Sequence, residues 1–175
     1  MDAFILGQVL SAFSGVFLLI CMRSRNKISF LFFNSISNLF GCISMLVLGA
    51  YAATIGPIVL TLQGVITYHY EKDQKEQSRL LLALYLLLNI FGGILTVNSI
   101  LGILPIISSS LASIMLMTKD VKTSRKINLI SSLLALPYLI TSKAYMSAVI
   151  FGSSFFNTLH AIYKIDYKEK YKENE

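Results

Sequence analysis

Two carboxamide side chains, Gln63 and Asn157, lie near the centres of long apolar runs in this sequence. An unpartnered carboxamide in hydrocarbon is costly, so such a group turns inward toward another polar group, water or a ligand. An amide offers donors and acceptors together, which suits a neutral polyhydroxylated or zwitterionic small molecule. We therefore predict that Gln63 and Asn157 flank a substrate site. The alternative is that both amides only hold helices together.

Other polar side chains in the apolar runs could line the same site. Asn34 and Asn38 are one helical turn apart, and His160 lies one turn beyond Asn157. We include these three residues in the predicted substrate site. Several serines also lie in the runs, and we expect them to serve mainly in helix packing: Ser11, Ser14, Ser108, Ser109 and Ser110.

The apolar runs lack the groups that ion coupling, catalysis or metal binding would require. All nine acidic residues lie outside them, so no buried carboxylate is available for a proton relay or a sodium site. The chain has no Walker A pattern, which argues against ATP drive. The two histidines, His69 and His160, have no orienting acid, and Cys21 and Cys42 have no metal-ligand spacing. We expect no enzyme activity, no cofactor and no metal site.

The elements that must position these side chains are membrane helices. The chain of 175 residues is 55% hydrophobic and only 14% charged, too apolar for a soluble domain. A bilayer core of about 30 Å needs about 20 helical residues, and seven runs approach this length. They are Ala3–Met22, Ile28–Leu48, Thr54–Tyr70, Leu80–Val97, Ser99–Met117, Ile127–Ser142 and Tyr145–Tyr163. The sixth run is the shortest, and Pro137 could kink it.

The basic residues predict the orientation of these spans. Those that follow the first, third, fifth and seventh runs make up 14 of the 15 Lys and Arg residues, and Lys143 alone falls on the other side. Cytoplasmic loops are enriched in Lys and Arg, so the N-terminus is predicted outside and the C-terminus inside. The net charge of +6 thus reflects topology, and we expect no nucleic-acid partner.

Weak internal repeats suggest a duplicated three-span unit. "NKISF" from Asn26 resembles "RKINL" from Arg125, and "GAYAA" from Gly49 resembles "KAYMS" from Lys143. The spacing falls from 99 to 94 residues between these matches. We predict an all-α protein with two parallel three-helix repeats joined by a linker helix. The predicted units are 1–70, a loop and linker helix at 71–98, 99–163 and a tail at 164–175.

This layout resembles that of the SWEET sugar transporters, whose halves are parallel repeats. The resemblance covers span count, N-out orientation and the linker helix, but the chain is short and has no Pro-Gln pair. In the SWEET layout opposed amides on spans three and seven contribute to the substrate site. The resemblance therefore implies that role for Gln63 and Asn157.

A second resemblance covers nearly the whole chain. The residues that carry it are the basic cluster Arg23, Arg25 and Lys27, "LGAYAA" before span three, "ILPI" in span five and "FFNTLHAIYK" in span seven. They are similar to the YgjV-like bacterial inner-membrane proteins, in which an amide in span three is followed by Arg one turn later. Here Gln63 matches the amide and Ile66 replaces the Arg. The resemblance implies a multi-pass protein of the bacterial inner membrane and no particular activity.

Together these observations predict a passive transporter of a small neutral or zwitterionic solute that works by alternating access. The alternative is a non-transporting membrane subunit or scaffold whose polar residues only pack helices. The lipid bilayer is the expected partner. Gly92 and Gly93 would allow close helix contact and could form a homodimer face.

Overall fold

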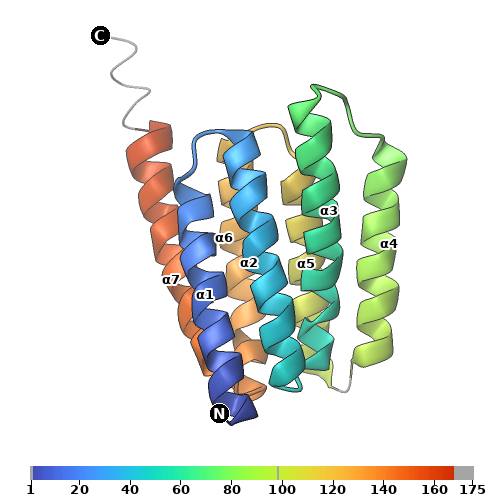
Figure 1. The fold of residues 1–175 in the computed structure, drawn as a ribbon, viewed down its shortest axis with the longest axis vertical. Helices are drawn as coiled ribbons and strands as arrows, with labels where there is room; N and C mark the ends of the chain where they lie inside the picture. The colour runs from blue at the N-terminus through green and yellow to red at the C-terminus, as the bar shows by residue number, and fades with distance from the viewer. Residues whose placement is uncertain (1, 98, 168–175) are drawn as a thin grey trace.

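The computed structural model describes residues 2–97 and 99–167 and is all-α over that range. Seven α-helices follow one another, connected by short turns and two 3₁₀ segments (Figure 1). Their bounds are α1 Ala3–Arg23, α2 Lys27–Val47, η1 Tyr51–Ala53, α3 Ile55–Lys72, α4 Arg79–Thr96, η2 Ile100–Gly102, α5 Ile103–Met117, α6 Val121–Thr141 and α7 Tyr145–Ala161. The π-helix Ile162–Tyr167 continues α7. Residues 168–175 of the predicted tail lie outside the described range.

Four segments are long and apolar enough to cross a membrane by length and composition: α1, α2, α4 and η2 with α5. The helices α3, α6 and α7 occupy three of the predicted spans without meeting that criterion. Polar residues in α6 and α3 and the 17-residue length of α7 account for this. The all-α membrane fold is thus confirmed, while inside and outside remain assigned by the positive charges alone.

The predicted start of the sixth helix was wrong. The helix α6 begins at Val121 instead of Ile127 and has 21 residues, about 31 Å at 1.5 Å per residue. Asp120 caps it, since its carboxylate accepts hydrogen bonds from the backbone N–H groups of Lys122 and Thr123. The basic first turns are therefore helical, and the sixth helix is as long as α2.

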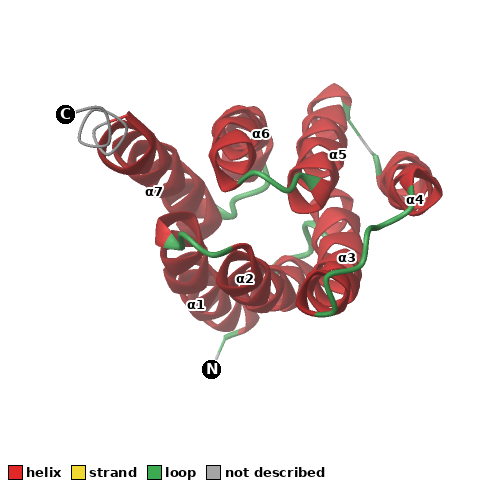
Figure 2. Ribbon diagram, turned by 90° about the horizontal axis from the view of Figure 1, so that it is seen from above, coloured by secondary structure: helices red, strands yellow, loops and turns green. Residues whose placement is uncertain are grey.

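Six helices form a closed ring. Neighbours in contact are α1 with α2, α2 with α3, α3 with α5, α5 with α6, α6 with α7, and α7 with α1. Figure 2 shows this ring from above, with α4 outside it against α3 and α5. We call α1–α3 the first bundle and α5–α7 the second bundle. Their helices pack against each other along two seams, the α3–α5 seam and the α1–α7 seam.

The two bundles repeat each other at one constant spacing. Residues 27 and 47 bound α2, and residues 121 and 141 bound α6, so both ends are shifted by 94 residues. Gly49 and Lys143, also 94 apart, both have positive φ, of 72° and 59°, in the turns that follow these helices. The predicted pairing of "NKISF" with "RKINL" at 99 is therefore not the structural correspondence.

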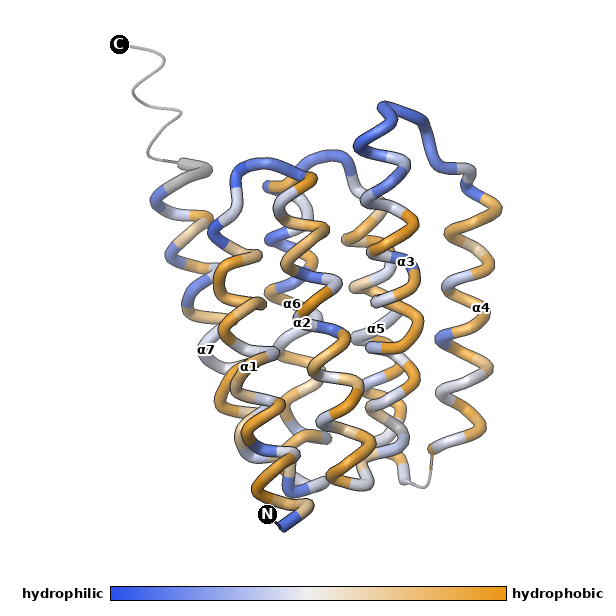
Figure 3. The backbone as a smooth tube through the Cα atoms, viewed as in Figure 1, coloured by the Kyte–Doolittle hydropathy of each residue, from blue (hydrophilic) through white to orange (hydrophobic). Residues whose placement is uncertain are grey.

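Polar loops gather at one end of the bundle. Figure 3 shows hydrophilic segments where α1, α3 and α5 end, with the N-terminus at the other end. We call this the basic end, defined by the loops at 24–26, 73–78 and 118–120. One buried apolar cluster lies toward it: Cys21, Met22, Phe30, Leu31, Leu60, Met115 and Leu116. A second lies toward the opposite end: Met45, Ala50, Ala53, Ala135, Leu139 and Ala144.

Candidate functional site

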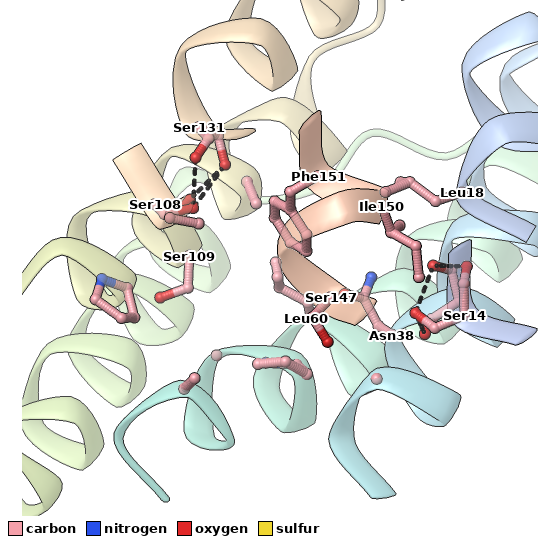
Figure 4. A pocket seen from close by; sticks show the side chains of 18 of the residues that line it. Ser14, Leu18, Asn38, Leu60, Ser108, Ser109, Ser131, Ser147, Ile150 and Phe151 are labelled. Carbon is pink, nitrogen blue, oxygen red and sulfur yellow. Dashed lines mark hydrogen bonds between the residues drawn. The ribbon is translucent and has the colours of Figure 1, made fainter. Parts of the chain in front are cut away.

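A central cavity of about 120 Å³ lies inside the ring, between the two apolar clusters. It has room for several water molecules, since one needs roughly 10–15 Å³. The lining residues come from both bundles, and Figure 4 shows their side chains converging. The polar ones are Ser11, Ser14, Asn34, Ser37, Asn38, Ser108, Ser109, Asn128, Ser131 and Ser147. No charged side chain is among these described lining residues, so the cavity offers only neutral hydrogen-bonding groups.

Two predicted residues, Asn34 and Asn38, do line the cavity. The amide of Asn38 donates to the side-chain oxygen of Asn34 and to its backbone carbonyl. The residue 94 positions after Asn34 is Asn128, which also lines the cavity. Asn128 Nδ2 donates to Ser154 Oγ at 3.3 Å and to Thr158 Oγ1 at 3.1 Å. Asn34 and Asn128 are thus the amides that the repeat places on opposite sides of the cavity.

Sequence reasoning missed Asn128, although the signal was present. "NSISN" at 34–38 and "NLISS" at 128–132 align at the spacing of 94 and share Asn, Ile and Ser. The false pairing at 99 displaced this alignment by five residues. A single spacing applied to the whole chain would have identified Asn128 as the counterpart of Asn34.

Most of the serines around the cavity are joined to each other. Ser14 Oγ donates to Ser37 O and Ser37 Oγ to Ser14 O, both at 2.8 Å. Ser108 and Ser131 repeat this reciprocal pair, at 2.9 and 3.1 Å. Each pair joins two helices of the same bundle, α1 to α2 and α5 to α6. This arrangement agrees with the expectation that serines in the spans serve in helix packing.

The prediction that Gln63 and Asn157 face each other is contradicted by the geometry. Gln63 Nε2 donates to Ser113 O at 2.8 Å across the α3–α5 seam, and Asn157 Nδ2 to Leu19 O at 3.4 Å across the α1–α7 seam. Both donors and both acceptors are 94 residues apart, so these are one contact made twice. Neither amide lines the cavity. Each amide side chain extends toward a helix of the other bundle, where a backbone carbonyl accepts its hydrogen bond.

Glycines allow close approach at the same two seams. A Cβ on Gly56 would lie 2.6 Å from Ser109 Cβ, and one on Gly15 would lie 2.5 Å from Ile150 Cγ1. The spacing of 94 relates Gly56 to Ile150 and Gly15 to Ser109. Each seam therefore pairs one glycine of the first bundle with one larger residue of the second bundle. Ser109 and Ile150 also line the cavity, so seam packing sets its width.

His160 lies in the last turns of α7, exposed and away from the cavity lining. It is therefore not brought together with Asn34 and Asn38 at the cavity. The reason is its position one turn beyond Asn157, which itself faces the α1–α7 seam near the basic end. Arg23 Nε donates to Asn157 Oδ1 at 3.2 Å in the same region.

The linker helix adds a buried polar contact that the sequence analysis did not identify. Asn89 of α4 is 1% exposed, and its Nδ2 donates to Ser113 Oγ at 2.9 Å. Ser113 thus joins α4 through its hydroxyl and α3 through its carbonyl, which accepts from Gln63. The oxygens of both amides, Gln63 Oε1 and Asn89 Oδ1, are buried without a hydrogen-bond partner. The contact attaches α4 to the α3–α5 seam.

Charged groups interact at the basic end, outside the helices' apolar parts. Lys119 Nζ lies 2.5 Å from Glu76 Oε1, and this hydrogen bond lowers the pKa of Glu76 and raises that of Lys119. The Thr123 hydroxyl and the capped backbone groups lower the pKa of Asp120. Among residues 2–97 and 99–167, no cluster of His, Cys, Asp or Glu could hold a metal ion.

Comparison with known families identifies the chain. The model of the Imp-YgjV family, described as bacterial inner membrane protein, matches residues 5–169. The chain therefore belongs to this family and is a multi-pass protein of the bacterial inner membrane. Neither curated proteins nor solved structures gave a match. The family establishes the location, and the geometry must support any function.

Proposed function

We propose that this inner-membrane protein is a passive transporter of a small neutral solute, which binds in the central cavity between the two bundles. The observation that carries the proposal is the cavity itself, which is uncharged, has both polar and apolar lining residues, and lies at the meeting of two repeated bundles. Sites at a repeat interface near the bilayer midplane are typical of transporters built from repeats. The layout also resembles that of the SWEET transporters in its linker helix.

The lining supports a neutral solute more strongly than a zwitterion. Hydroxyl and amide groups can donate and accept hydrogen bonds, which matches a polyhydroxylated molecule. A zwitterion would bring two charges into a cavity whose described lining holds no charge, at a large desolvation cost. We place Asn34, Asn38 and Asn128 at the solute, with Ser109 beside them.

The hydrogen bonds also support rocking of one bundle against the other. The serine pairs and the contacts of Asn128 join helices of the same bundle, so a rigid-body motion would leave them intact. The bonds that must change are those between bundles, such as those of Gln63 and Asn157. Alternating access requires this division into stable units and changeable contacts.

A ligand screen on the purified protein in detergent tests the proposal. Unfolding is followed by heating in the presence of sugars, polyols, amino acids and vitamins. A bound solute at 100 times its dissociation constant adds about 2.7 kcal/mol to stability. The double variant Asn34→Ala with Asn128→Ala is expected to lose the shift given by the best compound. The matched control is Gln63→Ala with Asn157→Ala, which removes two equivalent amides outside the cavity and is expected to keep it.

The result that contradicts the proposal is a screen with no stabilising compound, or one whose shift depends on the seam amides and not on the cavity amides. A positive result would be followed by flux of the same compound into liposomes. The absence of flux with binding intact would reject transport and retain the solute site.

A second candidate function is a membrane subunit or scaffold without a solute. The observation in its favour is that the serines of the cavity are largely satisfied by one another. Such a protein would show no ligand-dependent shift, and both double variants would only lower its stability.

A further inference from the structure

Two buried cations reach across the ring at its basic end. Lys27 of α2 is 8% exposed, and its Nζ donates to Met115 O of α5 at 3.3 Å. Arg125 of α6 is 2% exposed, and it donates from Nε to Met22 O at 3.2 Å and from Nη2 to Ser24 O at 3.1 Å. Each cation belongs to one bundle and binds the other.

The two contacts are built alike. Each acceptor lies at or just after the end of a helix, α5 for Lys27 and α1 for Arg125. Met115 O also accepts from the Thr118 N–H and from Ser124 Oγ. The C-terminus of a helix carries partial negative charge, which favours a cation there. Lys27 Nζ also lies 4.9 Å from the centre of the Phe30 ring, a distance at which a cation is attracted to the ring face. The helix ends thus offset part of the cost of burial.

Side chains from both bundles pack beside these cations. Met22, Phe30 and Leu31 of the first bundle are 0% exposed, as is Leu116 of the second. The corresponding cluster at the opposite end consists mainly of alanines. Toward that end, Gln8 and Ser11 of α1 make hydrogen bonds to the second bundle, at Lys143, Met146 and Ser147.

We propose that Lys27 and Arg125 form a double latch that holds the central cavity closed toward the basic end, so that the cavity opens more often toward the opposite end. The inference rests on the proposed function, because it names the gate of that same cavity. Opening toward the basic end requires both cations to leave their carbonyl partners, and the apolar layer beside them to part. The latch therefore sets how often the cavity faces that side.

The closed state can be tested in the full chain without changing the latch. A variant with both native cysteines replaced by alanine receives one cysteine at Ala112, a partly buried residue of α5 that lines the cavity next to the basic-end cluster. Proteoliposomes of both orientations are treated with a membrane-impermeant maleimide. The thiol is expected to react faster when the opposite end faces the reagent than when the basic end does. Equal or reversed labelling would overturn the proposal.

The latch itself is tested with a native reporter. Cys21 is 0% exposed, lies in the basic-end cluster and donates to Phe30 O at 3.2 Å. With Cys42 replaced by serine, labelling of Cys21 from the basic end reports how often this layer opens. Lys27→Met and Arg125→Met are each expected to accelerate labelling at least roughly ten- to a hundredfold, the effect of losing one buried hydrogen bond to a charged group, and each variant loses at least one.

The matched control is Lys126→Met, which removes an exposed cation next to Arg125 and is expected to leave the rate unchanged. Equal acceleration by this control, or none by the latch variants, would overturn the latch. Lys27→Arg keeps a cation at the site and is expected to stay close to the parent rate, which separates loss of the latch from general misfolding. Neither labelling experiment uses a solute, so their outcome is independent of the ligand screen. A gate without a ligand-dependent shift would keep the latch and reject the solute.

Discussion

Adding one methyl group at the α1–α7 seam should separate the two bundles locally. In the variant Gly15→Ala, the new Cβ would lie 2.5 Å from Ile150 Cγ1, 2.6 Å from Cδ1 and 2.8 Å from Cγ2. In a helix the χ1 angle of isoleucine is largely confined to one rotamer, so Ile150 does not readily turn away from the new methyl. The seam must then widen, since closely packed interiors do not absorb extra atoms without movement.

The magnitude follows from a comparison with Gly152→Ala on α7. A Cβ at Gly152 meets no atom within 4 Å, so this control gains only helix propensity, about 1 kcal/mol. The same gain applies at Gly15 and cancels in the difference between the variants. What remains is the overpacking term, typically about 1–3 kcal/mol. Gly15→Ala is therefore expected to be less stable than Gly152→Ala by that amount.

The assay is thermal unfolding of both variants in the same detergent, with a double variant that tests the cause. Replacing Ile150 by alanine removes all three crowded atoms, so Gly15→Ala should cost little in that background. A double-mutant cycle isolates this coupling. The reasoning is refuted if Gly15→Ala is as stable as Gly152→Ala, or if its cost persists when Ile150 is absent.

Three further outcomes follow from single contacts. Asp120→Ala removes the cap of α6 and should lower the stability by about 1 kcal/mol at neutral pH. The pKa of Asp120 is lowered on folding from its usual 3.8. The parent should therefore lose its extra stability over the variant in thermal unfolding as the pH falls below that value. Ser37→Ala and Ser131→Ala break equivalent serine pairs and should destabilise equally, each by roughly 0.6 kcal/mol, and unequal unfolding would deny the equivalence. Gln63→Met should change stability little, because it removes one hydrogen bond together with a buried oxygen that has no partner, and a large loss would contradict this.

The sequence predicted the helices well because hydrocarbon imposes their length and the loops carry their charge. It failed at the start of α6, where basic residues belong to the helix. Arg125 is buried there, although hydropathy treats it as a loop residue. Hydropathy averaged along the chain takes no account of the neighbouring helix end, which supplies carbonyl acceptors for that guanidinium group.

The candidate site was predicted in part. Asn34 and Asn38 line the cavity as expected, while Gln63, Asn157 and His160 do not. Position near the centre of a span identified amides that need a polar partner, and both central amides have one. Whether that partner is a solute or a carbonyl depends on which side of the helix faces the neighbouring helix. Helix packing decides which side of a span faces its neighbour, and the spacing of residues along one span does not show it.

Equivalence in a repeat also differs from proximity. A two-fold relation brings matched residues together only when both point to the axis, as Asn34 and Asn128 do from opposite walls of the cavity. Gln63 points to the α3–α5 seam, so its counterpart Asn157 must point to the α1–α7 seam, across the ring (Figure 2).

This geometry predicts independent effects for the two seam amides. Gln63→Ala and Asn157→Ala share no hydrogen-bond partner, so their costs in thermal unfolding should add to within about 0.5 kcal/mol in the double variant. Two amides that faced one another across a common site would instead be coupled. The first substitution would already have removed their shared interaction, so the second would cost less. A coupling energy above about 1 kcal/mol would therefore indicate that both residues lie together at the centre of the ring, and it would contradict the seam contacts.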